Sequence, residues 1–331
     1  MRFLLVALLA LSIGGASARS DVATAVIYVV SAAGGDRQAL TSGELAIQPS
    51  LSPDGKSIAF NSSAGIRVIN TDASGERGLG AAGGERPLWS PGGRSLAYTG
   101  ANSDRCIPPA QKCVVAEVWT VNADGTGVRK VFGTAVHPVW SPSGRLLAFR
   151  DFVVGESGDV VGRLKVARPD GSHVRTLFRG TALDGVHSLP AWSPNGKWIA
   201  FNAWRANGHR VFLVRADGSG LRRLANGTYP SWSPNGKLIA FERNRSVWVI
   251  PAAGGPARRL SADGRCPTWS PSGRQIAFLT NGAPGSLLEV VRPDGRGKRV
   301  LARAADCYAY GWSEPSPPVW SRDGGSIYFV G

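Results

Sequence analysis

One short phrase recurs seven times along the chain, and it constrains the fold more than any other feature. A typical copy, Pro138-Val139-Trp140-Ser141-Pro142-Ser143-Gly144, joins a Trp-Ser pair to a Pro-x-Gly sequence. The leading prolines of the seven copies lie 37 to 52 residues apart, at Pro49, Pro87, Pro138, Pro190, Pro230, Pro267 and Pro318. A period of this length is typical of β-propeller blades and not of helical solenoids.

Each part of the phrase predicts a local structure. Ser-Pro-x-Gly matches a type I turn, because Pro presets φ at the second position and Gly suits the fourth. A short strand follows each turn, as in Ile199-Ala200-Phe201, with large side chains on one face and alanine on the other. A blade between two neighbours buries both faces, so the Trp before the turn is expected to wedge between blades instead of stacking on a ligand.

A second half-phrase follows each first one and completes a four-stranded unit. Examples at 118–125 and 211–218 read as a third strand and an Asp-Gly turn, after which a fourth strand ends in Leu or Val. The chain starts with a second half-phrase near 26–41 and finishes with a first half-phrase near 318–330. We therefore predict an all-β, seven-bladed β-propeller of four-stranded antiparallel blades, closed by pairing of the N- and C-terminal strands.

The N-terminus predicts export. Arg2 precedes a short apolar run, and Ala16-Ser17-Ala18 supplies the small residues that a signal peptidase requires. We expect residues 1–18 to be a signal peptide and residues 19–331 to form a single propeller domain, periplasmic or extracellular. The apolar run is too short for a permanent membrane span, and no later stretch is long enough.

The four cysteines of an exported chain favour two disulfides, for which three pairings exist. Cys106 and Cys113 frame a short loop and are natural partners, which leaves Cys266 with Cys307. A metal site is the alternative, but the sequence contains no C-x-x-C motif or Cys/His cluster.

The formal net charge of +15 raises the question of an anionic partner. Many basic residues fall on the predicted fourth, outermost strands, at Arg129-Lys130, Arg175, Arg222-Arg223, Arg258-Arg259 and Lys298-Arg299. Charges there protect an exposed sheet edge from aggregation. Because this charge is spread around a rim and the chain is exported, we expect no nucleic-acid partner.

The phrase Trp-Ser-Pro-Asp/Asn-Gly-Lys/Arg-x-Ile-Ala-Phe, with its Asp-Gly turn and Arg-Arg-Leu, resembles the TolB-type propeller repeat. Similar units occur in the propellers of dipeptidyl and prolyl peptidases. The resemblance covers nearly all of the chain after residue 18, for the propeller part only, without the α/β domain that precedes it in TolB. It implies a periplasmic scaffold that binds an envelope protein at the propeller mouth. The predicted blade number of seven differs from the six of TolB itself.

A search for catalytic motifs favours a non-enzymatic protein. The sequence contains no G-x-S-x-G, H-E-x-x-H, P-loop or EF-hand spacing, and its Asp-Gly pairs are expected to be turns, so we expect no cofactor. His137 and His187 are expected on or near the innermost strands of adjacent blades. They leave open an alternative, a metal-assisted lyase or lactonase with its site in the central channel.

The residue before each leading proline should occupy an equivalent place around the channel. These residues differ in chemistry while the framework repeats, and they are Gln48, Arg86, His137, Leu189, Tyr229, Cys266 and Pro317. A mixed polar, aromatic and basic ring suits a peptide or a small anionic ligand. We predict a binding site at the channel mouth formed by Gln48, Arg86, His137, His187 and Tyr229.

Longer inserts at 101–116, 150–163 and 302–317 break the spacing and could carry recognition. Their exposed candidates are Asp104, Arg105, Asp151, Glu156, Asp159, Tyr308, Tyr310 and Trp312. The sequence thus predicts an exported, TolB-like monomer that acts as a protein- or ligand-binding scaffold in the cell envelope.

Overall fold

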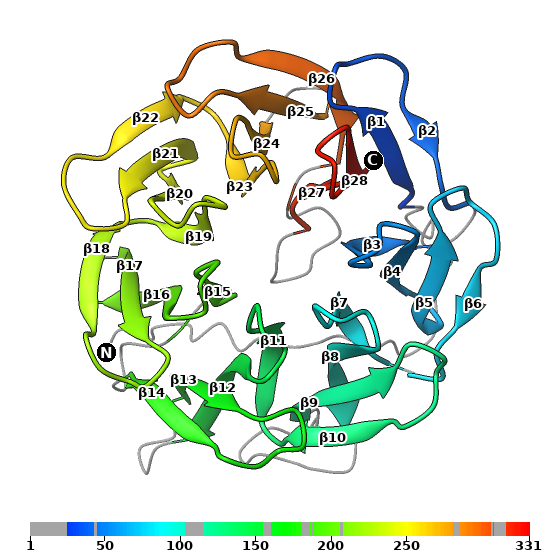
Figure 1. Ribbon diagram of the computed structural model, residues 1–331, viewed down its shortest axis with the longest axis vertical. Coiled ribbons are helices and arrows are strands. Elements are labelled where there is room, and N and C mark those ends of the chain that lie inside the picture. Colours follow the sequence, from blue (N-terminus) through cyan, green and yellow to red (C-terminus); the bar gives the residue numbers. More distant parts are fainter. Residues whose placement is uncertain are drawn as a thin grey trace, which may run out of the picture.

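A computed structural model of the chain describes residues 25–42, 45–81, 83–102, 115–154, 160–180, 186, 189–205, 208–280, 285–305, 307 and 316–331. These residues form seven four-stranded antiparallel sheets, arranged as blades around a ring (Figure 1). The predicted fold class is confirmed. The structure finds no helix in the described ranges that could cross a membrane. The predicted signal peptide lies outside them.

The strands of the blades follow one another in chain order. Blade 1 consists of β3 (Ile47–Leu51), β4 (Ser57–Ser62), β5 (Gly65–Asn70) and β6 (Arg77–Gly78). Blade 2 consists of β7 (Glu85–Trp89), β8 (Ser95–Asn102), β9 (Val115–Asn122) and β10 (Arg129–Phe132). Blade 3 consists of β11 (Ala135–Trp140), β12 (Leu147–Val154), β13 (Val160–Ala167) and β14 (Arg175–Arg179). Blade 4 consists of β15 (Ala191–Trp192), β16 (Trp198–Arg205), β17 (Gly208–Arg215) and β18 (Arg222–Asn226). Blade 5 consists of β19 (Thr228–Trp232), β20 (Leu238–Arg243), β21 (Ser246–Pro251) and β22 (Arg258–Ser261). Blade 6 consists of β23 (Arg265–Trp269), β24 (Ile276–Thr280), β25 (Ser286–Val291) and β26 (Arg299–Ala304).

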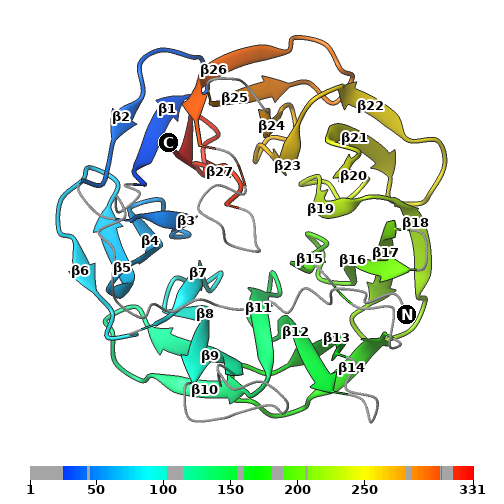
Figure 2. The same cartoon turned by 180° about the vertical axis from the view of Figure 1, so that it is seen from behind.

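Blade 7 is assembled from both ends of the chain. It contains β27 (Val319–Trp320) and β28 (Ser326–Val330) from the C-terminal side, and β1 (Ile27–Ser31) and β2 (Gln38–Ala39) from the N-terminal side. β1 pairs with β28 along its whole length, from Ile27 opposite Val330 to Ser31 opposite Ser326. Both views of the ring show these two strands side by side (Figures 1 and 2). The predicted closure is confirmed.

The contact between blades repeats because the sequence repeats. The alanine of one blade's second strand packs against the large apolar residues of the next blade, as Ala148 does against Ile199 and Phe201. In blades 2 to 7 the Trp before the turn lies in the same seam, and in five of these blades, all except that of Trp89, its indole N–H donates to a carbonyl of the preceding blade. In blade 4, Trp192 Nε1 donates to the Val139 oxygen at 3.1 Å. The same bond recurs from Trp140, Trp232, Trp269 and Trp320. The tryptophans are wedges, as predicted.

The seam between blade 7 and blade 1 uses different residues for the same purpose. Leu51 stands where other blades have Trp, and Tyr328 stands where other blades have the small alanine. Both belong to one apolar cluster with Ile58 and Phe60. A larger residue on one side offsets a smaller one on the other, so the volume of the seam is conserved.

The ring has two different faces. Because neighbouring strands run antiparallel, the turns between first and second strands and those between third and fourth strands lie on one face. We call it the turn face, and it carries the Ser-x-x-Gly turns at 52–55, 90–93, 141–144, 193–196, 233–236, 270–273 and 321–324. The first strand of each blade begins on the opposite face, which we call the mouth face.

The predicted basic residues lie on the outermost strands, except Lys298, which directly precedes β26, and several of them also join blades. Arg77 of blade 1 donates to the Ala123 carbonyl of blade 2 at 2.7 Å, and Arg299 of blade 6 donates to the Ala33 carbonyl of blade 7 at 2.7 Å. Equivalent bonds come from Arg175, Arg222 and Arg258. These guanidinium groups therefore link neighbouring blades, in addition to placing positive charge on the exposed edge strand of each sheet.

Candidate functional site

The residues before the leading prolines share an unusual backbone conformation. Five of them have positive φ angles of 50° to 60°: Gln48, Arg86, His137, Tyr229 and Cys266. Each lies near the start of the first strand of its blade, where the pairing register with the second strand shifts. Such a bulge re-aims a side chain out of the regular ladder. We call these five the ring residues.

Side chains of the preceding blade hold the ring residues in place. A bulged residue loses a ladder bond, so its backbone N–H needs another acceptor. The Arg86 N–H donates to Gln48 Oε1 at 3.0 Å, and the His137 N–H donates to Thr99 Oγ1 at 3.0 Å. The Tyr229 N–H donates to Asn202 Oδ1 at 3.4 Å. Neighbouring blades therefore fix one another at the mouth.

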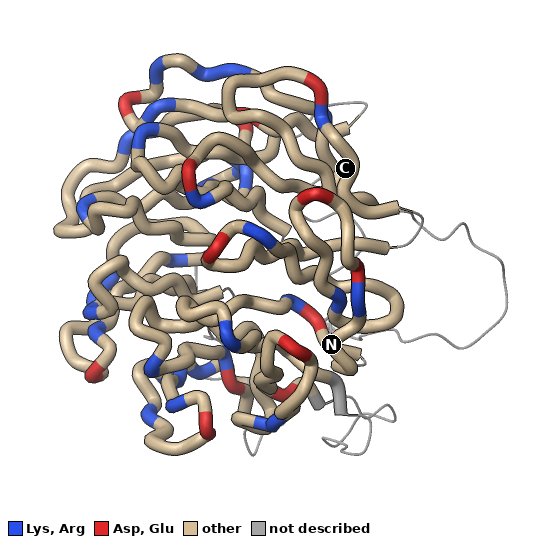
Figure 3. Tube along the Cα trace, turned by 45° about the vertical axis from the view of Figure 1, so that its right-hand side comes forward, with Lys and Arg blue, Asp and Glu red and all other residues tan. Residues whose placement is uncertain are grey.

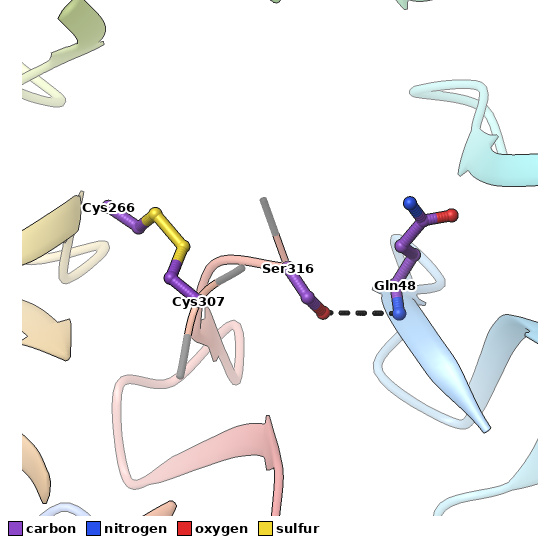
Figure 4. The surroundings of a disulfide bond; sticks show 4 residues. All are labelled: Gln48, Cys266, Cys307 and Ser316. Carbon is purple, nitrogen blue, oxygen red and sulfur yellow. Dashed lines mark hydrogen bonds between the residues drawn. A yellow bond between two sulfur atoms is a disulfide. The ribbon is translucent and has the colours of Figure 1, made fainter. Parts of the chain in front are cut away.

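A disulfide fastens the connection between blades 6 and 7 to this ring. Cys266 on β23 is bonded to Cys307, which follows β26, with 6.6 Å between their Cα atoms (Figure 4). The Ser316 N–H donates to the Cys307 carbonyl, and Ser316 Oγ accepts the Gln48 N–H at 3.1 Å. A continuous strap thus joins blade 6 to blade 1. This is the pairing expected from the sequence, whereas Cys106 and Cys113 lie outside the described residues.

Two arginine side chains act on the buried His137. His137 is only 7% exposed. Burial holds its pKa well below the ordinary value of 6.5, and the nearby Arg86 and Arg150 guanidinium groups lower the pKa further. The imidazole is therefore neutral at neutral pH, with two cations beside it. Arg86 also interacts with the Glu85 carboxylate, and both guanidinium groups are able to donate charge-assisted hydrogen bonds to an anionic group.

One predicted recognition residue, Asp151, was wrongly expected to be exposed. It is fully buried on β12 and forms ion pairs with Arg163 and, at 2.8 Å, with Lys165 Nζ. The first and last residues of the apparent insert at 150–163 extend strands β12 and β13, which pair with each other. These residues therefore belong to the sheet. Asp151 is a satisfied structural carboxylate. The other insert candidates, Asp104, Arg105, Glu156, Asp159, Tyr308, Tyr310 and Trp312, lie outside the described residues.

The two-histidine metal hypothesis stays a prediction, because His187 lies outside the described residues. Within those ranges the structure holds no group of three or more His, Cys, Asp or Glu side chains that could bind a metal. Leu189 and Pro317 are described, but neither has a positive φ or lies within a strand.

Sequence reasoning missed the second-strand residues that support the ring. Thr99, Arg150 and Asn202 each come directly after the Ala-Tyr or Ala-Phe pair of their blades. The same position holds Asn61 in blade 1 and Glu242 in blade 5, so it is polar in five blades, directly after the apolar segment of the second strand. That pattern was a readable signal for side chains that face the mouth.

Comparisons with known proteins agree with this architecture. The family model of the TolB beta propeller domain matches residues 109–306. An uncharacterized protein of Agrobacterium fabrum is 26% identical over 202 residues, which cover 56% of this chain and 64% of that protein. The match thus spans less than two thirds of that relative.

Several solved structures share the fold. A putative TolB from Agrobacterium tumefaciens has a TM-score of 0.57 at 18% identity, covering 93% of this chain and 97% of its own. An oligogalacturonate lyase from Vibrio parahaemolyticus has a TM-score of 0.62 at 12% identity, covering 77% and 79%. A puromycin-hydrolyzing peptidase from Mycobacterium tuberculosis has a TM-score of 0.64 at 16% identity, covering 82% and 49%.

At these identities the structural matches establish the fold and nothing finer. The family model, in contrast, covers more than half of the sequence and includes four of the seven copies of the repeat. On this evidence the chain belongs to the TolB beta-propeller domain family.

Proposed function

We propose that the chain is an exported binding scaffold of the cell envelope, which takes an acidic segment of a partner protein or peptide at the ring residues. The observation that carries the proposal is the contrast between a repeated framework and a varied ring. Gln48, Arg86, His137 and Tyr229 stand at equivalent bulges but differ in chemistry. Since the neighbouring blades already hold these bulges, binding costs little reorganisation of the backbone.

The charge of the mouth supports an anionic ligand. Arg86 and Arg150 both act on the buried His137 and lower its pKa. A carboxylate placed between these groups would form charge-assisted hydrogen bonds, which are stronger than neutral ones. The neutral imidazole can add a donor or an acceptor.

Export is supported by two features of the chain. Residues 1–18 have the pattern of a signal peptide. The Cys266–Cys307 disulfide supports the same location, because disulfides form and persist mainly in oxidising compartments. A periplasmic or extracellular location fits both.

The test is capture from a solubilised cell-envelope extract by immobilised protein, with partners quantified by mass spectrometry. We expect a stoichiometric partner on the wild type and at least about a tenfold loss for Arg86→Gln, since a hydrogen bond to a charged group contributes about 1.5 to 3 kcal/mol. Arg245→Gln is the matched control, an exposed arginine in the turn after β20 on the same face. Equal capture by wild type and Arg86→Gln would refute the site.

The competing function is a metal-assisted lyase or lactonase in the channel. What favours it is the buried, neutral His137 at the mouth, because neutral imidazole is a common metal ligand. Incubation of the purified protein with manganese and either oligogalacturonate or a lactone discriminates the two functions. Turnover that His137→Ala abolishes would establish the enzyme, whereas unchanged substrate together with a captured partner would establish the scaffold.

A further inference from the structure

The turn face carries a ring of exposed cations that the proposed function does not use. In six blades the residue after the Gly of the Ser-x-x-Gly turn is basic and exposed: Lys56, Arg94, Arg145, Lys197, Lys237 and Arg274. Blade 7 has Gly325 instead. None of these six side chains forms a hydrogen bond or an ion pair with the described part of the chain. Their side chains are therefore accessible to an external partner.

Several carboxylates of the same face accept hydrogen bonds within their own turns. Asp124 Oδ1 accepts the Thr126 hydroxyl and N–H, and Asp217 Oδ1 accepts the Ser219 N–H. These bonds lower the pKa values of both carboxyl groups. The aspartates form the turns and stay ionised, so they offset part of the positive charge of this face. Figure 3 shows Lys and Arg at many separate positions along the chain, with Asp and Glu positions among them.

A groove on this face gathers three arginines. It lies between blades 2 and 3, has a volume of about 580 Å³, and is lined by Arg129, Arg145 and Arg168 together with the hydroxyl-bearing Ser95 and Thr120. Asp170 also lines it, and its carboxyl pKa is lowered by the Ser172 hydroxyl, by its backbone bond and by the arginines. Three guanidinium groups against one carboxylate leave a net positive groove that fits a phosphate group.

Exposed aliphatic side chains accompany the cations in blades 2, 3 and 4. Val128, Val174 and Leu221 are 47%, 43% and 47% exposed. Each directly precedes the first arginine of its fourth strand, close to the turn face. Large apolar side chains beside basic ones are typical of protein surfaces that bind at the interface of a membrane.

We propose that the turn face docks on a bilayer that contains anionic phospholipids, with the groove between blades 2 and 3 holding a headgroup phosphate. A ring of cations around a broad face matches a two-dimensional anionic surface better than a linear polyanion, which would contact only a few blades. The aliphatic residues match the apolar layer below the headgroups and have no counterpart in a polyanion. Docked this way, the mouth face points away from the membrane and stays open to its partner.

The direct test is sedimentation of the full chain with vesicles of equal parts phosphatidylcholine and phosphatidylglycerol, compared with pure phosphatidylcholine. We expect binding only to the anionic vesicles, weakening with salt. The variant Arg145→Glu/Lys197→Glu/Lys237→Glu should bind at least about 100-fold more weakly, since each basic residue near such a surface contributes a factor of about five. Val174→Ser/Leu221→Ser should bind several-fold more weakly with an unchanged salt dependence.

The matched control carries the same charge change on the mouth side. Arg179, Arg245 and Arg303 are exposed, and Arg179→Glu/Arg245→Glu/Arg303→Glu should bind the vesicles as the wild type does. Equal loss in both triple variants would overturn the proposal, because attraction would then depend on net charge alone. It would also be overturned if the wild type bound duplex DNA or an acidic polysaccharide but not the vesicles. Unfolding midpoints of all variants confirm that each is folded.

Discussion

A Val30→Pro variant is expected to lose roughly 3 kcal/mol or more of its free energy of unfolding. Val30 is buried in β1 and lies opposite Ile327 of β28, at the pairing that closes the ring. Proline has no N–H for this ladder, and its ring would distort the central strand of blade 7. Because blade 7 joins both ends of the chain, we expect the loss to appear in the unfolding of the whole propeller. Urea unfolding followed by circular dichroism measures it.

Ala39→Pro is the matched control for this closure. Ala39 is exposed on the edge strand β2, and the Leu40 N–H donates inward to the Ile27 carbonyl at 2.8 Å. By strand alternation the Ala39 N–H points outward, so a proline there removes no ladder bond. We expect a change within about 1 kcal/mol. Equal stability of Val30→Pro and wild type would show that the terminal strands do not hold the ring together.

A Trp192→Ala variant is expected to lose about 3 to 5 kcal/mol of its free energy of unfolding, the usual cost of removing a buried tryptophan. Trp192 is 9% exposed and packs in the cluster that joins blades 3 and 4. Its indole N–H donates to the Val139 carbonyl. The substitution leaves a cavity in that seam and an unsatisfied carbonyl beside it. Thermal or urea unfolding checks the value.

The same blade offers a control of the same residue type. Trp204 on β16 is 40% exposed and contacts the His209 ring edge-on, with 4.8 Å between centroids. Trp204→Ala should cost less than about 1 kcal/mol, as exposed substitutions do. If Trp192→Ala were as mild as Trp204→Ala, the tryptophans would not be the wedges between blades.

Much of this fold was predictable because the same short sequence pattern recurs in each blade. Seven Ser-x-x-Gly turns, the alternation in segments such as Ile199-Ala200-Phe201, and the two half-phrases at the ends specify the blade, its strands and its closure. The exchange of Leu51 and Tyr328 at the last seam could not be predicted, because it depends on two residues far apart in sequence that meet only in the closed ring.

The candidate site was predictable only in outline. The variable residue before each proline identified Gln48, Arg86, His137 and Tyr229 as a ring. The sequence did not predict the positive φ angles of these four residues, because a residue before proline usually takes an extended conformation. Arg150 was missed and Asp151 was misassigned because the spacing of the repeats marks 150–163 as an insert, whereas the first residues of this segment continue strand β12.

The most direct test of the account is the pKa of His137, measured by NMR titration of the imidazole in the folded protein, with His137→Gln to assign the signal. We predict a pKa below 6.5, rising when Arg86 or Arg150 is replaced by Gln, because the buried ring and both cations disfavour its charged form. The unfolded chain then binds the proton more readily than the folded protein. As the pH is lowered from 6.5, the free energy of unfolding should therefore decrease by at most about 1.4 kcal/mol per pH unit, and this decrease should be smaller in His137→Gln. A His137 pKa at or above 6.5, unaffected by either arginine, would contradict a buried, cationic binding site at the mouth of the propeller.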